Sequence, residues 1–244
     1  MVNELDLKAK LRMGSDIDVC GITIKNYKLG EIFNDIGITK YLQMTGLISR
    51  SPSDFIDKKY LKEISSVTMF DIFCMSYEMQ ELFMETMKFF TGYEWRFVAN
   101  RAFVEFQATN TSDKDVHINK ENHEHILNTI KEMYCLSEVK KESEREDIDD
   151  RMKEILAEFE EEENKVNKAK GGKITIFSII DGVSTKHPSI NILNIWNLTM
   201  FQLMRNFYSL GKNINEDRVM NGIYSGVIDS KKIDLDKIHW ATES

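Results

Sequence analysis

The residues from Met69 to Phe90 constrain the fold of this chain more than any other stretch. They read MFDIFCMSYEMQELFMETMKFF and hold five Met and five Phe in 22 residues. A helix with this composition is apolar all round, whereas a helix at a protein surface keeps one polar face. The stretch therefore predicts a central core helix. A second interpretation is an adaptable surface for a partner, because Met packs against irregular and varied shapes.

The rest of the chain favours an α+β fold that is predominantly α-helical. Two prolines in 244 residues favour long helices over a many-stranded barrel or sandwich. Residues 93–107 carry the alternation typical of strands on both sides of Asn100–Arg101, which predicts a small β-hairpin. A short β-like alternation at Ile22 and Ile24 leads into helical spacing that stops at Gly37.

A strongly acidic region divides the chain. Residues 138–163 contain 13 acidic and five basic residues and keep one apolar stripe, which predicts a long acidic amphipathic helix. Gly171–Gly172 then predicts a break or hinge. We therefore expect a helical N-terminal domain at 1–137 that includes the hairpin, the acidic helix and Gly-Gly hinge at 138–172, and a C-terminal helical segment at 173–244. Whether the last segment packs on the first domain is left open.

Asparagines mark the expected starts of two further helices. Asn119 is expected to cap the helix that follows it, and Asn194 to cap a helix over residues 195–210. A helix that starts at Asn194 would bury Trp196, Met200 and Leu203 on one side. A separate last helix is expected over residues 216–224.

Charge and composition exclude several classes of protein. A net charge of −8 and a pI of about 5.3 argue against nucleic acid as a partner, since phosphate binding needs clustered Lys and Arg. The scattered cysteines Cys20, Cys74 and Cys135 are typical of a reducing compartment. No apolar leader and no membrane-spanning stretch is found, so we expect a cytoplasmic protein with no membrane partner.

Catalytic and metal-binding patterns are missing from the sequence. No phosphate-binding loop, dinucleotide fingerprint or nucleophile elbow is present. The nearest approach to a metal site is formed by His117, His123 and His125. His123 and His125 are two residues apart on an expected helix and point to different faces, which opposes shared coordination. We expect no catalytic residues, no cofactor and no metal, and hence a protein that is not an enzyme.

Two segments resemble a family of small proteins in the tail gene clusters of phages and prophages of Gram-positive bacteria. Near the N-terminus, Leu29, Glu31, Ile32, Ile36, Gly37 and Tyr41 match the pattern L-x-E-I-x-x-I-G-x-x-x-Y, with Asp35 as one extra residue. Near the C-terminus, Ile195, Trp196, Leu198, Thr199, Gln202 and Leu203 match the pattern IW-x-LT-x-x-QL. Both motifs are structural, so the resemblance carries over no functional residue.

The resemblance implies a non-enzymatic factor in phage tail morphogenesis, in the cytoplasm of the bacterial host. Its most specific form is a tail assembly chaperone that binds the tape-measure protein. The alternative is a structural component of the virion, such as a tail, baseplate or head–tail connector subunit, and a homo-oligomer remains open. The candidate partner-binding residues are apolar side chains of the two most apolar helices: Met75, Met79, Phe83, Met87, Trp196 and Phe201.

Overall fold

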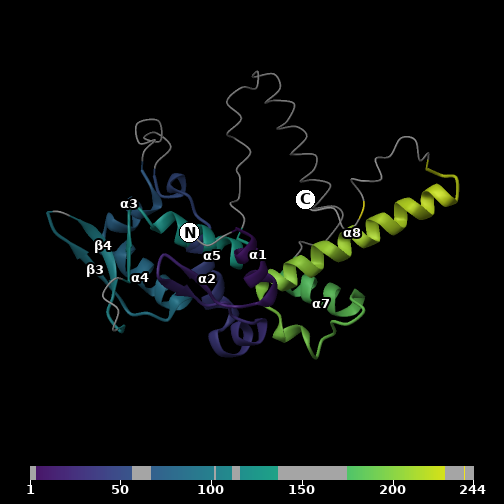
Figure 1. The fold of residues 1–244 in the computed structure, drawn as a ribbon, viewed down its shortest axis with the longest axis horizontal. Coiled ribbons are helices and arrows are strands. Elements are labelled where there is room, and N and C mark those ends of the chain that lie inside the picture. The colour runs from purple at the N-terminus through teal and green to yellow at the C-terminus, as the bar shows by residue number, and fades with distance from the viewer. Residues whose placement is uncertain are drawn as a thin grey trace, which may run out of the picture.

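The computed structural model describes residues 4–56, 67–101, 103–111, 116–136, 175–228 and 239 of the chain. These residues form helices and two small antiparallel sheets, which confirms an α+β fold that is mainly helical (Figure 1). The expected acidic helix with its Gly-Gly hinge at 138–172 lies outside the described residues.

The N-terminal part combines a helix, a tight hairpin and a helical corner. Helix α1 spans Glu4–Met13, and strands β1 (Ile17–Val19) and β2 (Ile22–Ile24) pair antiparallel. Helix η1 (Glu31–Ile36) ends at Gly37, as expected, and α2 (Ile38–Ile48) follows it directly. The short 3-10 turn η2 covers Pro52–Asp54. Ile17, Ile22 and Ile24 are fully buried, so this hairpin belongs to the core.

Helix η1 is a π-helix, and its position explains the extra residue in the N-terminal motif. The Gly37 N–H donates to the Ile32 carbonyl at 2.9 Å, a bond across five residues where an α-helix spans four. A wider turn takes up one additional residue without shifting the residues on either side of it. Asp35 is therefore accommodated while Ile32 stays buried and Gly37 still ends the helix.

The stretch from Met69 to Phe90 folds as two helices, so the prediction of one continuous helix is wrong. Helix α3 covers Met69–Cys74 and α4 covers Tyr77–Thr91. The break lies at Ser76, whose side chain accepts a hydrogen bond from the Met79 N–H at 3.3 Å and so caps α4. The bend brings the Phe73 and Phe83 rings together, stacked with their centroids 4.2 Å apart.

A three-stranded sheet packs against these helices. The predicted hairpin is confirmed by β3 (Trp95–Ala99) and β4 (Val104–Ala108), and a third strand, β5 (His117–Asn119), pairs with β4. Helix α5 (His123–Met133) begins after Asn122, so the prediction that Asn119 caps it is wrong. The Asn119 side chain instead accepts hydrogen bonds from the N–H groups of Glu121 and Asn122, which forms a turn.

One continuous apolar core joins the N-terminal hairpin, the helices and the sheet. Phe106 of β4 lies at its centre, with its ring 4.7 Å from that of Phe83 and 6.0 Å from that of Phe70. Tyr134, at the end of α5, is buried and donates a hydrogen bond to the Lys25 carbonyl at 2.7 Å. A buried hydroxyl needs such a partner, and this bond fixes α5 to the N-terminal hairpin.

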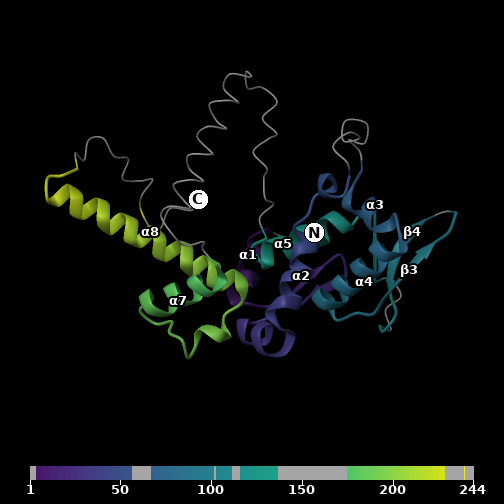
Figure 2. The same cartoon turned by 180° about the vertical axis from the view of Figure 1, so that it is seen from behind.

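The C-terminal part forms an arm with two helices. Helix α7 covers Ile176–Lys186, the 3-10 turn η4 covers Ile195–Asn197, and α8 covers Met200–Tyr224. The predictions of a helix starting at Asn194 and of a separate last helix are both wrong, because α8 begins at Met200, with Thr199 as its cap, and continues without interruption to Tyr224. The Asn194 side chain instead bridges the Asn191 N–H and the Ser189 carbonyl. Figures 1 and 2 show the outer half of α8 extending away from the other helices.

The two sequence motifs meet in space and join the arm to the N-terminal part. The Leu29 N–H donates to the Leu198 carbonyl at 2.8 Å, and Lys28 forms a β-bridge with Thr199. Gln202 completes a capping box with Thr199 and also donates to the Arg12 carbonyl at 2.8 Å. Both motifs are therefore parts of one packing junction. No helix among the described residues is long and apolar enough to cross a membrane.

Candidate partner-binding surface

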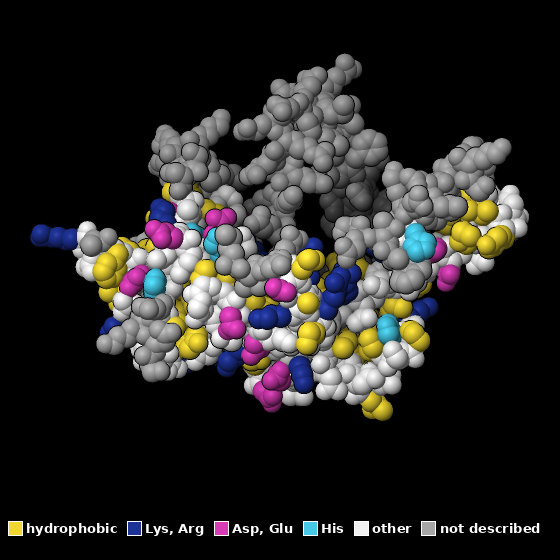
Figure 3. All heavy atoms as spheres, viewed as in Figure 1, with side chains coloured by type: hydrophobic (Ala, Val, Ile, Leu, Met, Phe, Trp, Pro, Cys, Tyr) yellow, Lys and Arg dark blue, Asp and Glu magenta, His cyan; other side chains and the backbone are white. Residues whose placement is uncertain are grey.

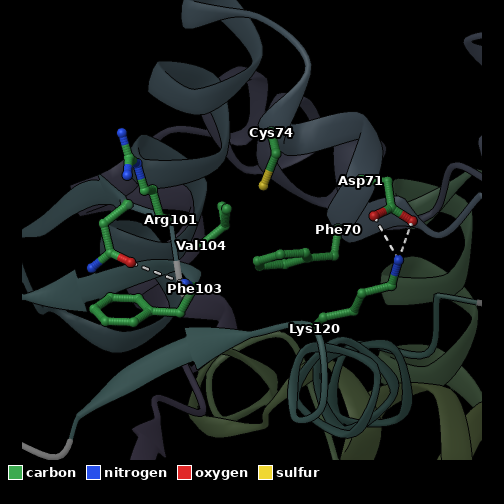
Figure 4. Close-up of a pocket in the computed structure, with 8 residues that line it drawn as sticks. Phe70, Asp71, Cys74, Arg101, Phe103, Val104 and Lys120 are labelled. Carbon is green, nitrogen blue, oxygen red and sulfur yellow. Dashed lines mark hydrogen bonds and ion pairs between the residues drawn. The ribbon is translucent and has the colours of Figure 1, made fainter.

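A hollow on the described surface lies between α3 and the tip of the β3–β4 hairpin, and we call it the α3–hairpin hollow (Figure 4). Its volume is about 390 Å³. The buried ring of Phe70 forms the floor, and Cys74, Phe103 and Val104 stand around it. Phe103 is 44% exposed and Val104 is 37% exposed, so apolar surface remains available to a partner. The hollow has the size and lining to receive one or two apolar side chains.

Charged groups flank the apolar floor. On one side, Lys120 forms an ion pair with Asp71 at 2.8 Å. Burial favours the neutral acid, but hydrogen bonds from Lys120 and Thr68 outweigh it and lower the pKa of the Asp71 carboxyl. On the other side, the exposed Arg101 forms no ion pair with any described residue. A partner that places an apolar side chain on Phe70 and a carboxylate near Arg101 would therefore match the hollow.

The titratable groups at the hollow are poorly suited to nucleophilic chemistry. Burial raises the pKa of the Cys74 thiol to about 11, so the thiol is protonated at neutral pH, and the thiolate is the reactive form. Asp71 is occupied by Lys120 and by the hydroxyl and N–H of Thr68. Within the described ranges, no three His, Cys, Asp or Glu side chains gather as a metal site would require.

The four predicted binding residues of the Met69–Phe90 stretch divide between surface and core. Met75 is 73% exposed and follows Cys74 at the edge of the hollow, while Met79 is half-buried. Phe83 and Met87 are fully buried, because the inner face of α4 packs against the sheet and α2. In this fold Met75 is available to a partner, and Phe83 and Met87 belong to the core. Partner binding by these residues stays a prediction.

Trp196 and Phe201 lie at the junction of the two motifs, far along the chain from α4. Both are half-buried and pack against the core. The Trp196 ring meets the Phe33 ring edge-on at 5.5 Å, and Phe33 also contacts Phe177 at 5.7 Å. This aromatic contact positions the arm. Neither Trp196 nor Phe201 lines the α3–hairpin hollow. The hollow therefore does not join them with Met75 in one binding surface.

The three histidines weighed as metal ligands occupy different environments. His117 is half-buried on β5, His125 is exposed, and His123 is buried with its ring 5.4 Å from that of Phe70. The Nδ1 of His123 lies 2.9 Å from the Lys120 carbonyl. Burial lowers the pKa of His123, because desolvation disfavours the charged imidazolium. His123 therefore packs against Phe70, the residue that forms the floor of the hollow.

Sequence reasoning did not single out Phe70, Phe103 or Val104 as surface residues. Phe70 looks like any other apolar residue of its stretch, and only the bend after α3 places it beneath the hairpin tip. A signal was present at Phe103 and Val104, because they directly follow the predicted turn, where strand residues are commonly exposed. That signal cannot say which helix the hairpin tip faces.

Comparison with known proteins gives one match. Residues 165–244 match the family model described as the YomV second domain. These residues include α7, η4 and α8, and with them the IW-x-LT-x-x-QL motif. The match indicates a protein family of the phage or prophage type. No curated protein and no solved structure matches the chain.

Proposed function

We propose that this protein is a non-enzymatic factor in phage tail morphogenesis, and most specifically a tail assembly chaperone that binds the tape-measure protein. One observation carries the proposal. The motif resemblance at 195–203 and the family match at 165–244 fall on the same part of the chain, and both point to phage or prophage proteins.

The α3–hairpin hollow supports the proposal, because its lining suits the binding site that such a chaperone would need. A helical client presents apolar side chains at regular spacing, and an apolar hollow with a charged rim can hold one of them. Phe70 would contact the apolar side chain, the exposed Phe103 and Val104 would enclose it, and the exposed Met75, next to Cys74 in the chain, could add a contact outside the hollow. Met75 suits varied client sequences because its unbranched side chain adapts its shape.

Co-expression with the tape-measure protein encoded in the same gene cluster tests the function. We expect the client to stay soluble and to co-purify with the chain. A client that neither co-purifies nor gains solubility would contradict the chaperone function. Mass spectrometry of purified particles is the second measurement. A chaperone should be absent from mature particles, and many copies in them would favour a structural virion component.

A surface variant tests the site separately. Phe103→Asp places a carboxylate on an exposed wall of the hollow, and we expect client capture to fall about tenfold or more, as at the centre of other interfaces. Leu42→Asp is the matched control, because Leu42 is 56% exposed on α2 and does not line the hollow. An equal loss of client capture in both variants, or no loss in either, would contradict the assignment of the hollow as the client-binding site.

A further inference from the structure

The two edges of the three-stranded sheet differ in how their backbone groups are satisfied. The sheet has the order β3-β4-β5, so β3 and β5 are its edge strands. On the β5 edge, the Asn122 side chain accepts a hydrogen bond from the Asn119 N–H and donates one to the His117 carbonyl, both at 2.9 Å. The Asn122 amide thus takes the place of a neighbouring strand and closes this edge.

The β3 edge has no such cover among the described residues. In an antiparallel pair, alternate residues direct their N–H and C=O groups to the partner strand. Glu94 bonds to Thr109 and Asn100 bonds to Phe103 at the two ends of the β3–β4 ladder, so the even-numbered residues of β3 face β4. The backbone groups of Trp95, Phe97 and Ala99 therefore point outward, and they make no hydrogen bond with any described residue.

The features that usually protect an edge strand are also sparse on β3. Edge strands are commonly blocked by Pro, by a bulge or by a charge placed on the edge. β3 contains no Pro and pairs with β4 over all five residues in unbroken register. Its one charged residue, Arg96, lies on the outer face and donates a hydrogen bond to Gln107 across the ladder at 2.8 Å. As far as the described residues show, the edge is thus open to another strand.

We propose that two copies of this chain pair antiparallel through their β3 edges, with a two-fold axis at Phe97. This register places Phe97 opposite Phe97 of the second copy and Trp95 opposite Ala99, so every outward N–H finds a carbonyl. It also places Arg96 beside Val98 of the second copy, so the two arginines do not face each other. The β3 edge is therefore complementary to itself in hydrogen bonding.

Ala99→Pro tests the pairing directly. The Ala99 N–H points outward, so proline there removes a bond across the dimer and leaves the β3–β4 ladder bonds in place. Sedimentation equilibrium of the full chain should show a concentration-dependent dimer, and the variant should weaken it about tenfold or more. A wild-type chain that is monomeric at its highest soluble concentration overturns the proposal, and so does an unchanged dimer in the variant.

Two substitutions at Val98 keep the proposal testable if the proline variant does not fold. Val98 faces Glu105 within the chain and Arg96 of the second copy in the dimer. Val98→Lys should stabilise the monomer and weaken the dimer, and Val98→Glu should do the reverse. Each should change the dissociation constant by about 2- to 30-fold, because the two-fold axis repeats the pair. Changes of dimer and monomer stability in the same direction would overturn the proposed register.

Hydrogen exchange supplies a readout at single amides. The amides of Phe97 and Ala99 should become protected as concentration rises, while those of Arg96 and Val98, bonded to β4, should be protected at all concentrations. Protection of Phe97 and Ala99 that appears only when the tape-measure protein is added would assign the edge to that partner and overturn self-pairing.

Discussion

Helices α4 and α8 have similar apolar residues but different roles. In α4, the side chains of Phe83, Met87 and Phe90 are fully buried, because the sheet, α2 and α3 surround its inner face. In α8, which is ten residues longer, only Met200 and Leu203 are buried. Residues of α8 that pack against the core end at Leu210. Burial depends on what surrounds a helix. Helix α4 is therefore a central element of the core, whereas α8 packs on the core only through its first part.

The largest effect is expected where α4 is most enclosed. Phe83 is fully buried between the rings of Phe73 and Phe106. Phe83→Ala should lower the free energy of unfolding by about 3–5 kcal/mol, because it leaves a cavity in a packed core. The neighbouring Leu82 is 40% exposed, and Leu82→Ala should cost about 1 kcal/mol or less. Denaturant unfolding measures both, and equal losses would contradict the assigned faces of α4.

A smaller effect is expected at the aromatic contact of the arm. From the sequence, Trp196→Ala would cost about 3–5 kcal/mol if the ring were fully buried. Trp196 is half-buried and meets Phe33 edge-on, so we expect about 1–3 kcal/mol. The exposed Tyr224 at the far end of α8 is the control, and Tyr224→Ala should change stability by about 0.5 kcal/mol or less. If Trp196→Ala lowered the free energy of unfolding as much as Phe83→Ala does, the result would contradict a peripheral position of the arm and would show that it is part of the core.

The start of α8 allows its cap to be separated from its attachment. Gln202 accepts from the Thr199 N–H at 3.0 Å and donates to the Arg12 carbonyl. Gln202→Ala removes both bonds and should cost about 1–2 kcal/mol. Gln202→Glu keeps the acceptor and loses only the donor, so it should cost less. Thermal unfolding of the two variants compares them, and equal costs would show that the cap contributes nothing measurable.

The smallest effect at neutral pH concerns His123, which packs behind α3 on Phe70. Its folded-state pKa lies below the ordinary value of 6.5, so below that pH the unfolded chain binds the proton more readily. Stability should therefore be full above pH 6.5 and fall as pH decreases toward the folded-state pKa. His123→Phe should flatten this part of the stability curve. His125→Phe, at an exposed position on the same helix, is the control for the substitution itself.

The sequence by itself determined the fold class, the hairpin at 93–107 and the stop at Gly37. Alternation, helical spacing and glycine conformation are local properties, so they can be read from neighbouring residues. The sequence also contained both motifs but could not show that Leu29 and Leu198 bond to each other, because that contact joins distant parts of the chain.

The tertiary structure alone decided where competing local signals took effect. Asn194 and Thr199 are both good helix caps, and Thr199 caps α8 because Gln202 completes the box and also reaches Arg12. The stretch at Met69–Phe90 breaks at Ser76 because the bend stacks Phe73 on Phe83. The closed β5 edge and the open β3 edge likewise depend on which side chain lies beside each strand. These outcomes follow from packing between distant segments, which no local pattern records.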